Sequence, residues 1–375
     1  MGHLLFEKDS LLFVPLPGGG METGMKNWVK GHKKILILCG IALAALIALL
    51  AVWQRQEFKK NSIGNTMPNP PRSEEPFIDT FYLDQLTERE KEAYDALKTA
   101  LDEYKGGEVI FPEPLTGLEF TRAYNALEYG ADDYFYGMIG IPMTEEDQNL
   151  AYKNDDIQLV EDPLIQKCLL FLYCSEGVDI NGSIDEDGYV TNLEELKDPL
   201  AAINEERMAE VQNIQEERDA VLNQVVADMP AEYGAKEAID YFLGWMDENL
   251  ILQQPSEQSQ GITAMSDFFT NLNFKSHLSC AAVKNAFASG YGRVLSDLCN
   301  RAGIRSHVVM GVWSSGFMGS SQESYMLTCV EIEGEPIYVD ASGSHKKQLL
   351  DQRYITEEGA MNWMDFVDYF TYGEE

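Results

Sequence analysis

Basic residues are scarce in this chain. Its 375 residues include 28 lysines and arginines against 62 aspartates and glutamates, and the formal net charge at pH 7 is −34. Residues 1–60 hold eight of the basic and four of the acidic residues, so the other 315 residues carry 20 basic and 58 acidic ones. A surface of this charge repels nucleic acid and anionic lipid, which argues against a nucleic-acid-binding protein. The acidic excess would attract cationic partners, but its simplest role is solubility.

Cysteine and histidine are too few and too scattered to predict a zinc site. The six cysteines form no CxxC pair, and the five histidines do not cluster with them, whereas a structural zinc ion takes four such ligands at close spacing. Apart from Cys39, the cysteines stand singly in apolar stretches and are predicted to be small core residues: Cys168, Cys174, Cys280, Cys299 and Cys329. No cofactor is expected.

One long apolar run predicts a membrane anchor. Residues 35–53 are 19 uncharged residues, and as a helix they would span about 28 Å, close to the thickness of a hydrocarbon core. No polar stripe interrupts the run, which disfavours a buried helix of a soluble protein. Four lysines precede it, so the N-terminus is predicted to be cytoplasmic and the C-terminal domain extracellular. No cleavage site stands out after it, which favours an uncleaved single-pass anchor at the cell membrane.

Composition and periodicity divide the chain into six segments. Four prolines between residues 54 and 76 predict a stiff, extended linker. A capping box at Thr87 and Glu90 opens a helical pattern directly after it. The segments are a cytoplasmic or untranslated stretch at 1–34, the transmembrane helix at 35–53, the linker at 54–76, a helical or mixed region at 77–230, a core at 231–345 and an acidic segment at 346–375.

Several short motifs follow one another in a fixed order near the C-terminus. They are Ala286-Phe287-Ala288-Ser289-Gly290-Tyr291 at the start of a helix, Leu298-Cys299 and Ala302-Gly303-Ile304 at its end, Val308-Val309-Met310-Gly311 as a strand, Tyr325-Met326-Leu327-Thr328 at the start of a second strand and Ile337-Tyr338-Val339-Asp340 as a third. This order resembles the core of the transglutaminase-like superfamily, a branch of the papain-like cysteine enzymes.

The resemblance extends to the helical region. The stretches Glu90-Lys91 with Tyr94-Asp95-Ala96-Leu97 and Ala238-Ile239-Asp240-Tyr241-Phe242-Leu243 are similar to helices of bacterial surface proteins in this family. The resemblance therefore covers residues 77–345 and implies an α+β fold. In such a fold a helical N-terminal region packs on a papain-like core, and the helix at 288–299 lies against an antiparallel sheet.

The resemblance also assigns the family's catalytic cysteine, histidine and aspartate to Ala288, Tyr325 and Asp340. The family chemistry needs a thiolate at a helix N-terminus and an imidazole that an aspartate orients. Ala288 has no nucleophile, the neighbouring Ser289 is not activated, and a tyrosine with a pKa near 10 is no base at neutral pH. Asp340 is preserved, and we read it as a turn residue. No intact catalytic site is predicted.

A rearranged cysteine–histidine pair is the alternative. It would need Cys280 or Cys329 to meet a histidine in space, and the sequence does not show such a meeting. The histidines available are His277, His307 and His345. Buried core cysteines and surface histidines are the favoured interpretation.

A second alternative concerns calcium. The stretch from Ser183 to Glu194 matches an EF-hand loop at several positions, including Asp185 and Asp187. Serine replaces the first carboxylate, which removes a ligand and a charge, so tight calcium binding is not expected and these residues are only a weak candidate site.

These patterns favour a membrane-tethered, extracytoplasmic, transglutaminase-like pseudoenzyme at a bacterial cell surface, acting as a non-catalytic binding or scaffolding module. Its predicted partners are the membrane, through residues 35–53, and an extended peptide or cell-envelope component in the residual cleft. The competing hypotheses are a cysteine peptidase or acyltransferase with a rearranged dyad, and a purely structural spacer.

Overall fold

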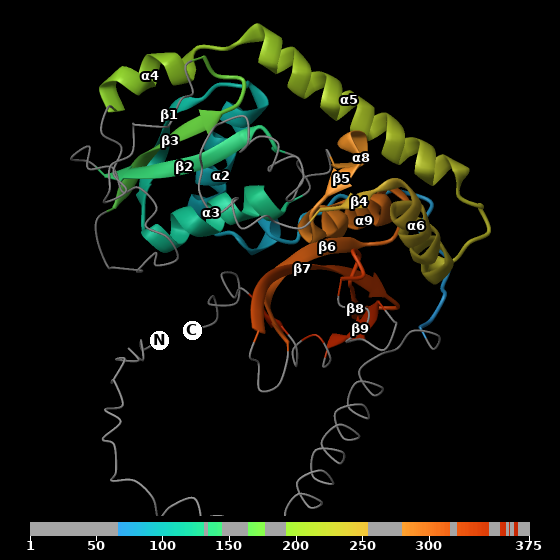
Figure 1. Cartoon of the computed structure of the whole chain (residues 1–375). Coiled ribbons are helices and arrows are strands. Elements are labelled where there is room, and N and C mark those ends of the chain that lie inside the picture. The colour runs from blue at the N-terminus through green and yellow to red at the C-terminus, as the bar shows by residue number, and fades with distance from the viewer. Residues whose placement is uncertain are drawn as a thin grey trace, which may run out of the picture. The chain divides into compact units, whose positions relative to one another are not determined.

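Two antiparallel sheets, each with helices packed against it, organise the described part of the chain in a computed structural model (Figure 1). The chain divides into two units, Met1–Glu57 and Phe58–Glu375, and everything described here belongs to the second. The structure describes residues 67–130, 134–144, 164–176, 193–253, 280–315, 321–344, 353–357, 360 and 364–366, without the side chains of 138–144, 193–195, 313–315, 321–324 and 364–366.

The first half is built on a three-stranded sheet in the order β1-β3-β2. Helices α2 and α3 both begin with capping boxes, at Thr87 with Glu90 and at Thr116 with Glu119, and the first of these was predicted. The elements are η2 (Leu83–Gln85), α2 (Glu88–Asp102), β1 (Gly107–Leu115), α3 (Gly117–Tyr129), β2 (Gly137–Thr144) and β3 (Ile165–Leu172).

Strand β3 settles an ambiguity in the sequence. The apolar run at residues 164–173 has no periodicity that separates a buried helix from a buried strand. It forms the central strand, paired with β1 on one side and β2 on the other. Its last five residues, from Cys168 to Leu172, are all buried, as a strand covered on both faces requires.

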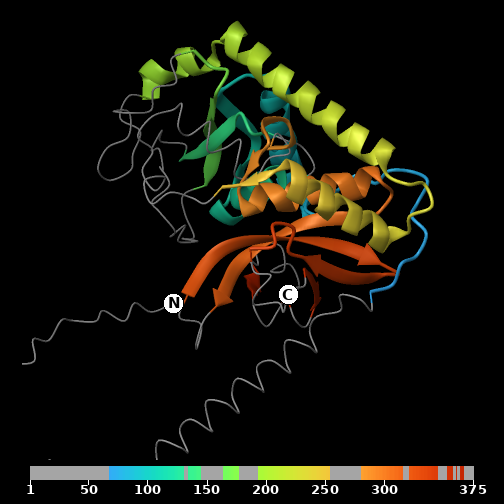
Figure 2. The same ribbon diagram turned by 45° about the vertical axis from the view of Figure 1, so that its right-hand side comes forward.

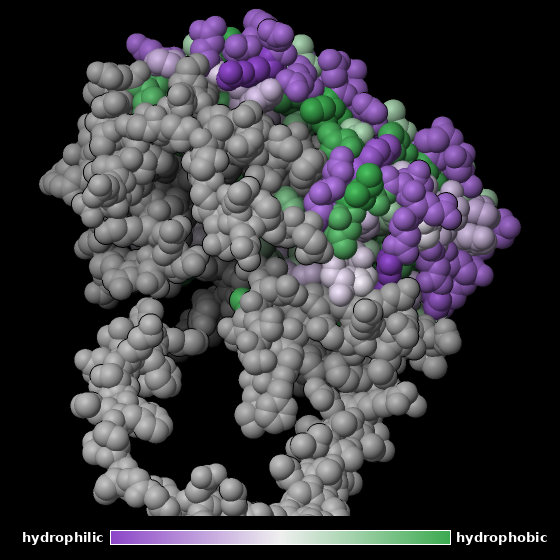
Figure 3. Space-filling model, viewed as in Figure 1, coloured by the Kyte–Doolittle hydropathy of each residue, from purple (hydrophilic) through white to green (hydrophobic). Residues whose placement is uncertain are grey.

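Helix α5 (Glu205–Asp228) connects the two halves. The apolar side chains spaced along residues 205–226 predict a long helix of nearly this extent. Helix α5 follows α4 (Leu193–Ala201) and precedes α6 (Ala235–Asn249). Near its start Val211 is buried in the hydrophobic cluster of the first half, and near its end Leu222 and Val225 are buried in that of the second. Its visible outer side is mostly hydrophilic, with hydrophobic residues between (Figure 3).

The second half is a five-stranded antiparallel sheet in the order β10-β6-β7-β8-β9, with helix α9 against one face (Figure 2). On that face the Thr328 hydroxyl donates to the Gly292 carbonyl at 2.8 Å. The elements are β4 (Ile251–Leu252), α8 (Cys280–Val283), β5 (Asn285–Ala286), α9 (Ala288–Arg301), β6 (Ser306–Ser315), β7 (Ser321–Ile332), β8 (Glu335–Val339), β9 (Tyr354–Thr356) and β10 (Met364–Phe366). The short strands β4 and β5 pair in parallel.

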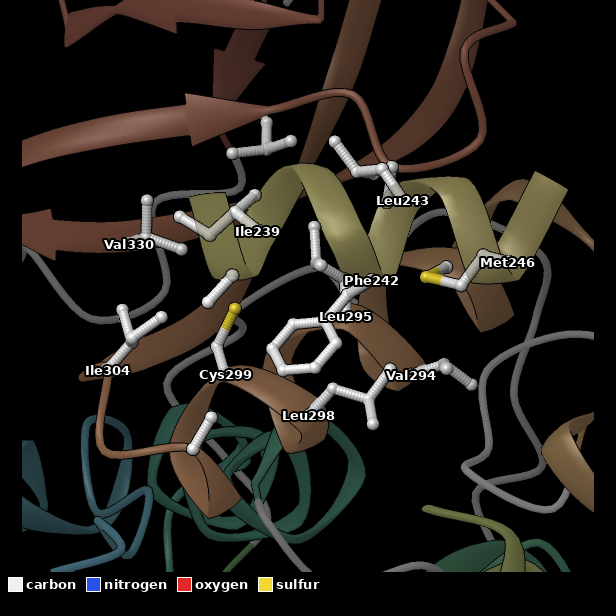
Figure 4. Packing of buried hydrophobic residues seen from close by; sticks show 14 of the residues in the cluster. Ile239, Phe242, Leu243, Met246, Val294, Leu295, Leu298, Cys299, Ile304 and Val330 are labelled. Atoms are coloured by element: carbon white, nitrogen blue, oxygen red, sulfur yellow. The ribbon is translucent and has the colours of Figure 1, made fainter. Parts of the chain in front are cut away.

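The core of this half lies between α6 and α9. Phe242 and Met246 of α6 face Val294 and Leu298 of α9, and all four are fully buried (Figure 4). The heptad-like spacing of apolar residues on both helices places one apolar side of each toward the other. This contact and the sheet fix the position and direction of α9.

The predicted linker is shorter than residues 54–76, because residues 67–73, here called the strap, pack on the folded domain. Met67 is buried, and the Asn69 side chain accepts a hydrogen bond from the Glu237 backbone N–H at the start of α6. Arg72 donates to the carbonyls of Tyr233 at 2.8 Å and Ala302 at 2.7 Å. Proline-rich composition suggested an extended spacer, but backbone and side-chain hydrogen bonds to distant residues hold these residues on the domain.

The sheet also extends beyond the predicted core boundary at residue 345. Strand β9 pairs with β8, and β10 pairs with β6, so both edges of the five-stranded sheet come from the segment predicted to be only an acidic tail. Within the described residues no helix is long and apolar enough to cross a membrane. The predicted anchor at 35–53 lies outside those residues and stays a prediction.

Candidate functional site

Ala288 is the first residue of α9. Its N-cap, Phe287, makes no side-chain capping bond, so the helix N-terminus retains the partial positive charge that would stabilise an anion there. Ala288 itself presents a methyl group. It packs against a small cluster, here called the Tyr325 cluster, made of Val309, Tyr325, Leu327, Cys329, Tyr338, Ile355 and Ala360.

Tyr325 lies on β7, opposite Gly311 of β6. Its side chain is buried, and its hydroxyl donates to Asp340 Oδ1 at 2.6 Å. The same hydroxyl lies 2.7 Å from Ser342 Oγ. A residue at this position of the strand is therefore in direct contact with Asp340, as the family's histidine would be with its aspartate.

Asp340 follows the last residue of β8 and is fully buried. Besides the Tyr325 hydroxyl, its Oδ1 accepts the Gly343 backbone N–H at 2.9 Å and the Ser342 hydroxyl at 3.2 Å. Its own N–H donates to the Arg353 carbonyl at 2.9 Å. Asp340 therefore ends a strand at a turn, as predicted for a turn residue, and also accepts the hydrogen bond of Tyr325 from the neighbouring strand β7.

The Tyr325 hydroxyl keeps its proton in this site. Burial raises the pKa of Tyr325 well above its usual value, and the charge of Asp340 raises it further. The phenol therefore stays protonated at physiological pH and donates a hydrogen bond to Asp340 Oδ1. Ala288 presents only a methyl group and Tyr325 a protonated phenol, so these two positions supply neither a nucleophile nor a base.

The cysteines and histidines proposed for a rearranged dyad are also placed. Cys280 is buried on α8, where its thiol donates to the Gly290 carbonyl at 3.5 Å. Cys329 and His307 are direct partners across β7 and β6, an encounter that the sequence did not reveal. His277 and His345 lie outside the described residues.

The Cys329–His307 pair has the wrong protonation states for catalysis. Burial raises the pKa of the Cys329 thiol to about 12 and lowers the pKa of His307 to about 4. The histidine ring stacks on Phe81, with ring centres 3.7 Å apart. A neutral thiol beside a neutral imidazole is not the thiolate–imidazolium pair of an activated cysteine.

The candidate calcium ligands lie outside the part of the chain that the structure describes. Asp185 and Asp187 lie outside it, as does the side chain of Glu194 in α4. In the part of the chain that the structure describes, no group of three histidine, cysteine, aspartate or glutamate side chains could hold a metal ion.

Comparison with known proteins adds little. No protein-family model matches the chain, and no curated protein does. One solved structure, described as the crystal structure of a TGase, matches at 12% identity with a TM-score of 0.27. The match covers 52% of this chain and 49% of that one, so this chain aligns with about half of its length. Such a match is only a weak likeness to a transglutaminase-like fold.

Proposed function

We propose that this chain is a non-catalytic, transglutaminase-like module that binds or scaffolds a partner at a bacterial cell envelope. The observation that carries the proposal is the Tyr325–Asp340 hydrogen bond beside Ala288. It places Tyr325 against Asp340, as a catalytic histidine and aspartate would be placed, while Ala288 offers only a methyl group where the family's thiol would attack an acyl carbon. A site of this kind can contact a ligand without catalysing a reaction on it.

The proposed ligand is an extended peptide or a cell-envelope component in the residual cleft. Of the rearranged dyads, the one between Cys329 and His307 is disfavoured, because burial keeps Cys329 protonated and His307 neutral.

The sharpest test restores the reacting groups. In Ala288→Cys, the new thiol should have a pKa below the usual value near 8.5, because the helix N-terminus stabilises a thiolate. Adding Tyr325→His should lower that pKa further, since an imidazolium stabilises the same charge and Asp340 can orient the ring. The measurement is the pH dependence of iodoacetamide alkylation at residue 288, resolved by peptide mass spectrometry.

Wild type and Tyr325→His alone are the controls, because they report how the native cysteines react. Alkylation midpoints near 8.5 in both cysteine variants would mean that residue 288 does not face residue 325 across a working site. Separately, hydrolase or transamidase activity of the wild-type protein that is lost with labelling of one native cysteine would refute the non-catalytic proposal.

The tether is a second part of the proposal, supported by the uncharged run at residues 35–53 and the lysines before it. If the domain is extracellular, protease treatment of intact cells should remove the part of the chain that follows residue 60. A known surface protein and a cytoplasmic protein serve as positive and negative controls. Survival of the domain under conditions that digest the surface control would contradict the orientation.

A further inference from the structure

A pocket lies on a different side of α9 from Ala288. Its volume is about 170 Å³, and neither Ala288 nor Tyr325 nor Asp340 lines it. Apolar walls come from Phe77 and Ile78. An engineered protein cavity of about 150 Å³ binds benzene, so this pocket has room for a ligand of that size.

The polar side chains of α9 that line the pocket already have partners. Asn300 donates to the Ser306 carbonyl and accepts the Ser306 N–H, each at 2.9 Å. Asp297 pairs with Arg301 at 2.9 Å. Asn300 thus ties the end of α9 to the start of β6, and Asp297 is engaged in an ion pair within the helix.

Arg293 is buried and directed toward the end of α3. Its Nη2 donates to the Glu128 carbonyl, and its Nη1 lies 3.5 Å from the Gly130 carbonyl. Its guanidinium also lies over the Tyr129 ring, 5.8 Å from the ring centre. Carbonyl dipoles and an aromatic face therefore offset much of its charge.

Asp79 is different, because it has acceptor capacity to spare. Its Oδ1 accepts the Phe81 N–H at 3.0 Å, and no hydrogen bond to Oδ2 is found within the described residues. An ionised carboxylate only accepts hydrogen bonds and has about four lone-pair sites. A ligand that completes this pocket must therefore bring a donor.

We propose that the pocket binds a small organic cation: one protonated amine on an apolar body of about six to eight non-hydrogen atoms. The ammonium would lie against Asp79, and the body would lie between Phe77, Ile78 and Tyr129. Ile78 is 83% exposed, which is unusual for a large apolar side chain and places an uncovered apolar surface beside the half-buried carboxylate of Asp79. A cation is also the charge that this strongly acidic chain would attract.

The state of Asp79 makes the site sensitive to pH. Burial raises the pKa of Asp79 to about 6, and Asp84 adds to the rise, while the Phe81 N–H and Arg293 oppose it. Burial also raises the pKa of Tyr82, and the charge of Asp79 adds to that rise. Asp297, the other carboxylate that lines the pocket, also has a pKa raised by burial, although its ion pair with Arg301 opposes the rise. Below pH 6 most Asp79 is protonated, and the ligand must then bind the ionised minority. The affinity for an amine should fall about tenfold between pH 7 and pH 5.

The test uses the full-length protein in detergent micelles and isothermal titration calorimetry, with a micelle-only titration subtracted. Benzylamine is the probe, and benzyl alcohol is its uncharged match. Benzylamine should bind at pH 7 with a Kd of about 1 mM or below, as expected for a ligand of this size. Benzyl alcohol should bind at least tenfold more weakly, and only the amine should lose affinity at pH 5.

Three variants distinguish specific binding in the pocket from non-specific binding of the probe. Asp79→Asn keeps an oxygen for the Phe81 N–H, and it should remove both the preference for the amine and the pH dependence. Ile78→Ala should weaken benzylamine several-fold, whereas Ile110→Ala, at a residue 69% exposed that does not line the pocket, should not.

Saturable binding of both probes with equal affinity, or none of benzylamine at millimolar concentration, would overturn the proposal. So would equal effects of the two isoleucine variants. The residues of the proposed function are untouched in every variant, so failure here leaves the Tyr325–Asp340 argument standing.

Discussion

Replacing Arg122 with methionine should lower the free energy of unfolding by about 3–5 kcal/mol. Arg122 Nε donates to Glu90 Oε1 at 2.9 Å, and both side chains are less than a tenth exposed. Arg122 also donates to the Gln85 carbonyl at 2.7 Å. Methionine fills most of the space but leaves a buried carboxylate without its cation, and this loss of compensation accounts for most of the effect.

The comparison is with an exposed ion pair on α2, the helix that carries Glu90. Lys91 and Glu88 lie 3.3 Å apart with Glu88 almost fully exposed, so Lys91→Met should change stability by less than about 1 kcal/mol. Adding Glu90→Gln to Arg122→Met should recover part of the loss, because the amide is uncharged. Urea denaturation followed by circular dichroism measures all four proteins. A loss under about 1 kcal/mol for Arg122→Met would show that water or relaxation compensates Glu90.

Gly303→Ala should be the second strongly destabilising change, at about 3 kcal/mol. Gly303 has a φ of +77°, and a Cβ there would lie 2.1 Å from the Ser73 carbonyl oxygen of the strap. Part of the loss is the left-handed backbone itself, worth about 1–2 kcal/mol for a residue other than glycine. The rest comes from displacing the strap, whose Ser73 N–H donates to the Gly303 carbonyl at 3.0 Å.

Gly334→Ala is the matched control. Gly334 has a φ of +86° in the turn between β7 and β8, and a Cβ there would meet no atom within 4 Å. It should therefore show the backbone term alone, about 1–2 kcal/mol. Urea denaturation gives both values, and limited proteolysis should cut the strap faster only in Gly303→Ala. Equal losses and equal cleavage would mean that the strap does not pack on Gly303.

The sequence was sufficient where local rules decide the structure. Thr87 and Glu90 mark a helix start through one capping box, and the apolar face of residues 205–226 marks a long helix. Ala288, Tyr325 and Asp340 were placed by motif order, and the structure has them on α9, β7 and the end of β8.

What the sequence missed depends on distant contacts. The strap reads as a linker, because Arg72 meets Ala302 only across 230 residues of chain. Asp79 carries no motif in the sequence, and the residues that form a pocket with it come from α3 and α9. Ser342 stands two residues after Asp340 and hydrogen-bonds with both Asp340 and Tyr325. The sequence places Ser342 near Asp340, but only the fold brings the Tyr325 hydroxyl to both residues.

Helix α5 has a consequence for how this chain could be divided in evolution. A boundary at residue 230, where composition suggested one, assigns the whole helix to the first half. Leu222 and Val225 would then be separated from the second half, although they belong to its hydrophobic cluster. A boundary earlier in the helix would remove Val211 from the first half instead. Both halves therefore need residues of the same helix for their cores. Recombination should keep the two halves together, because a break within or beside α5 would remove core residues from one of them.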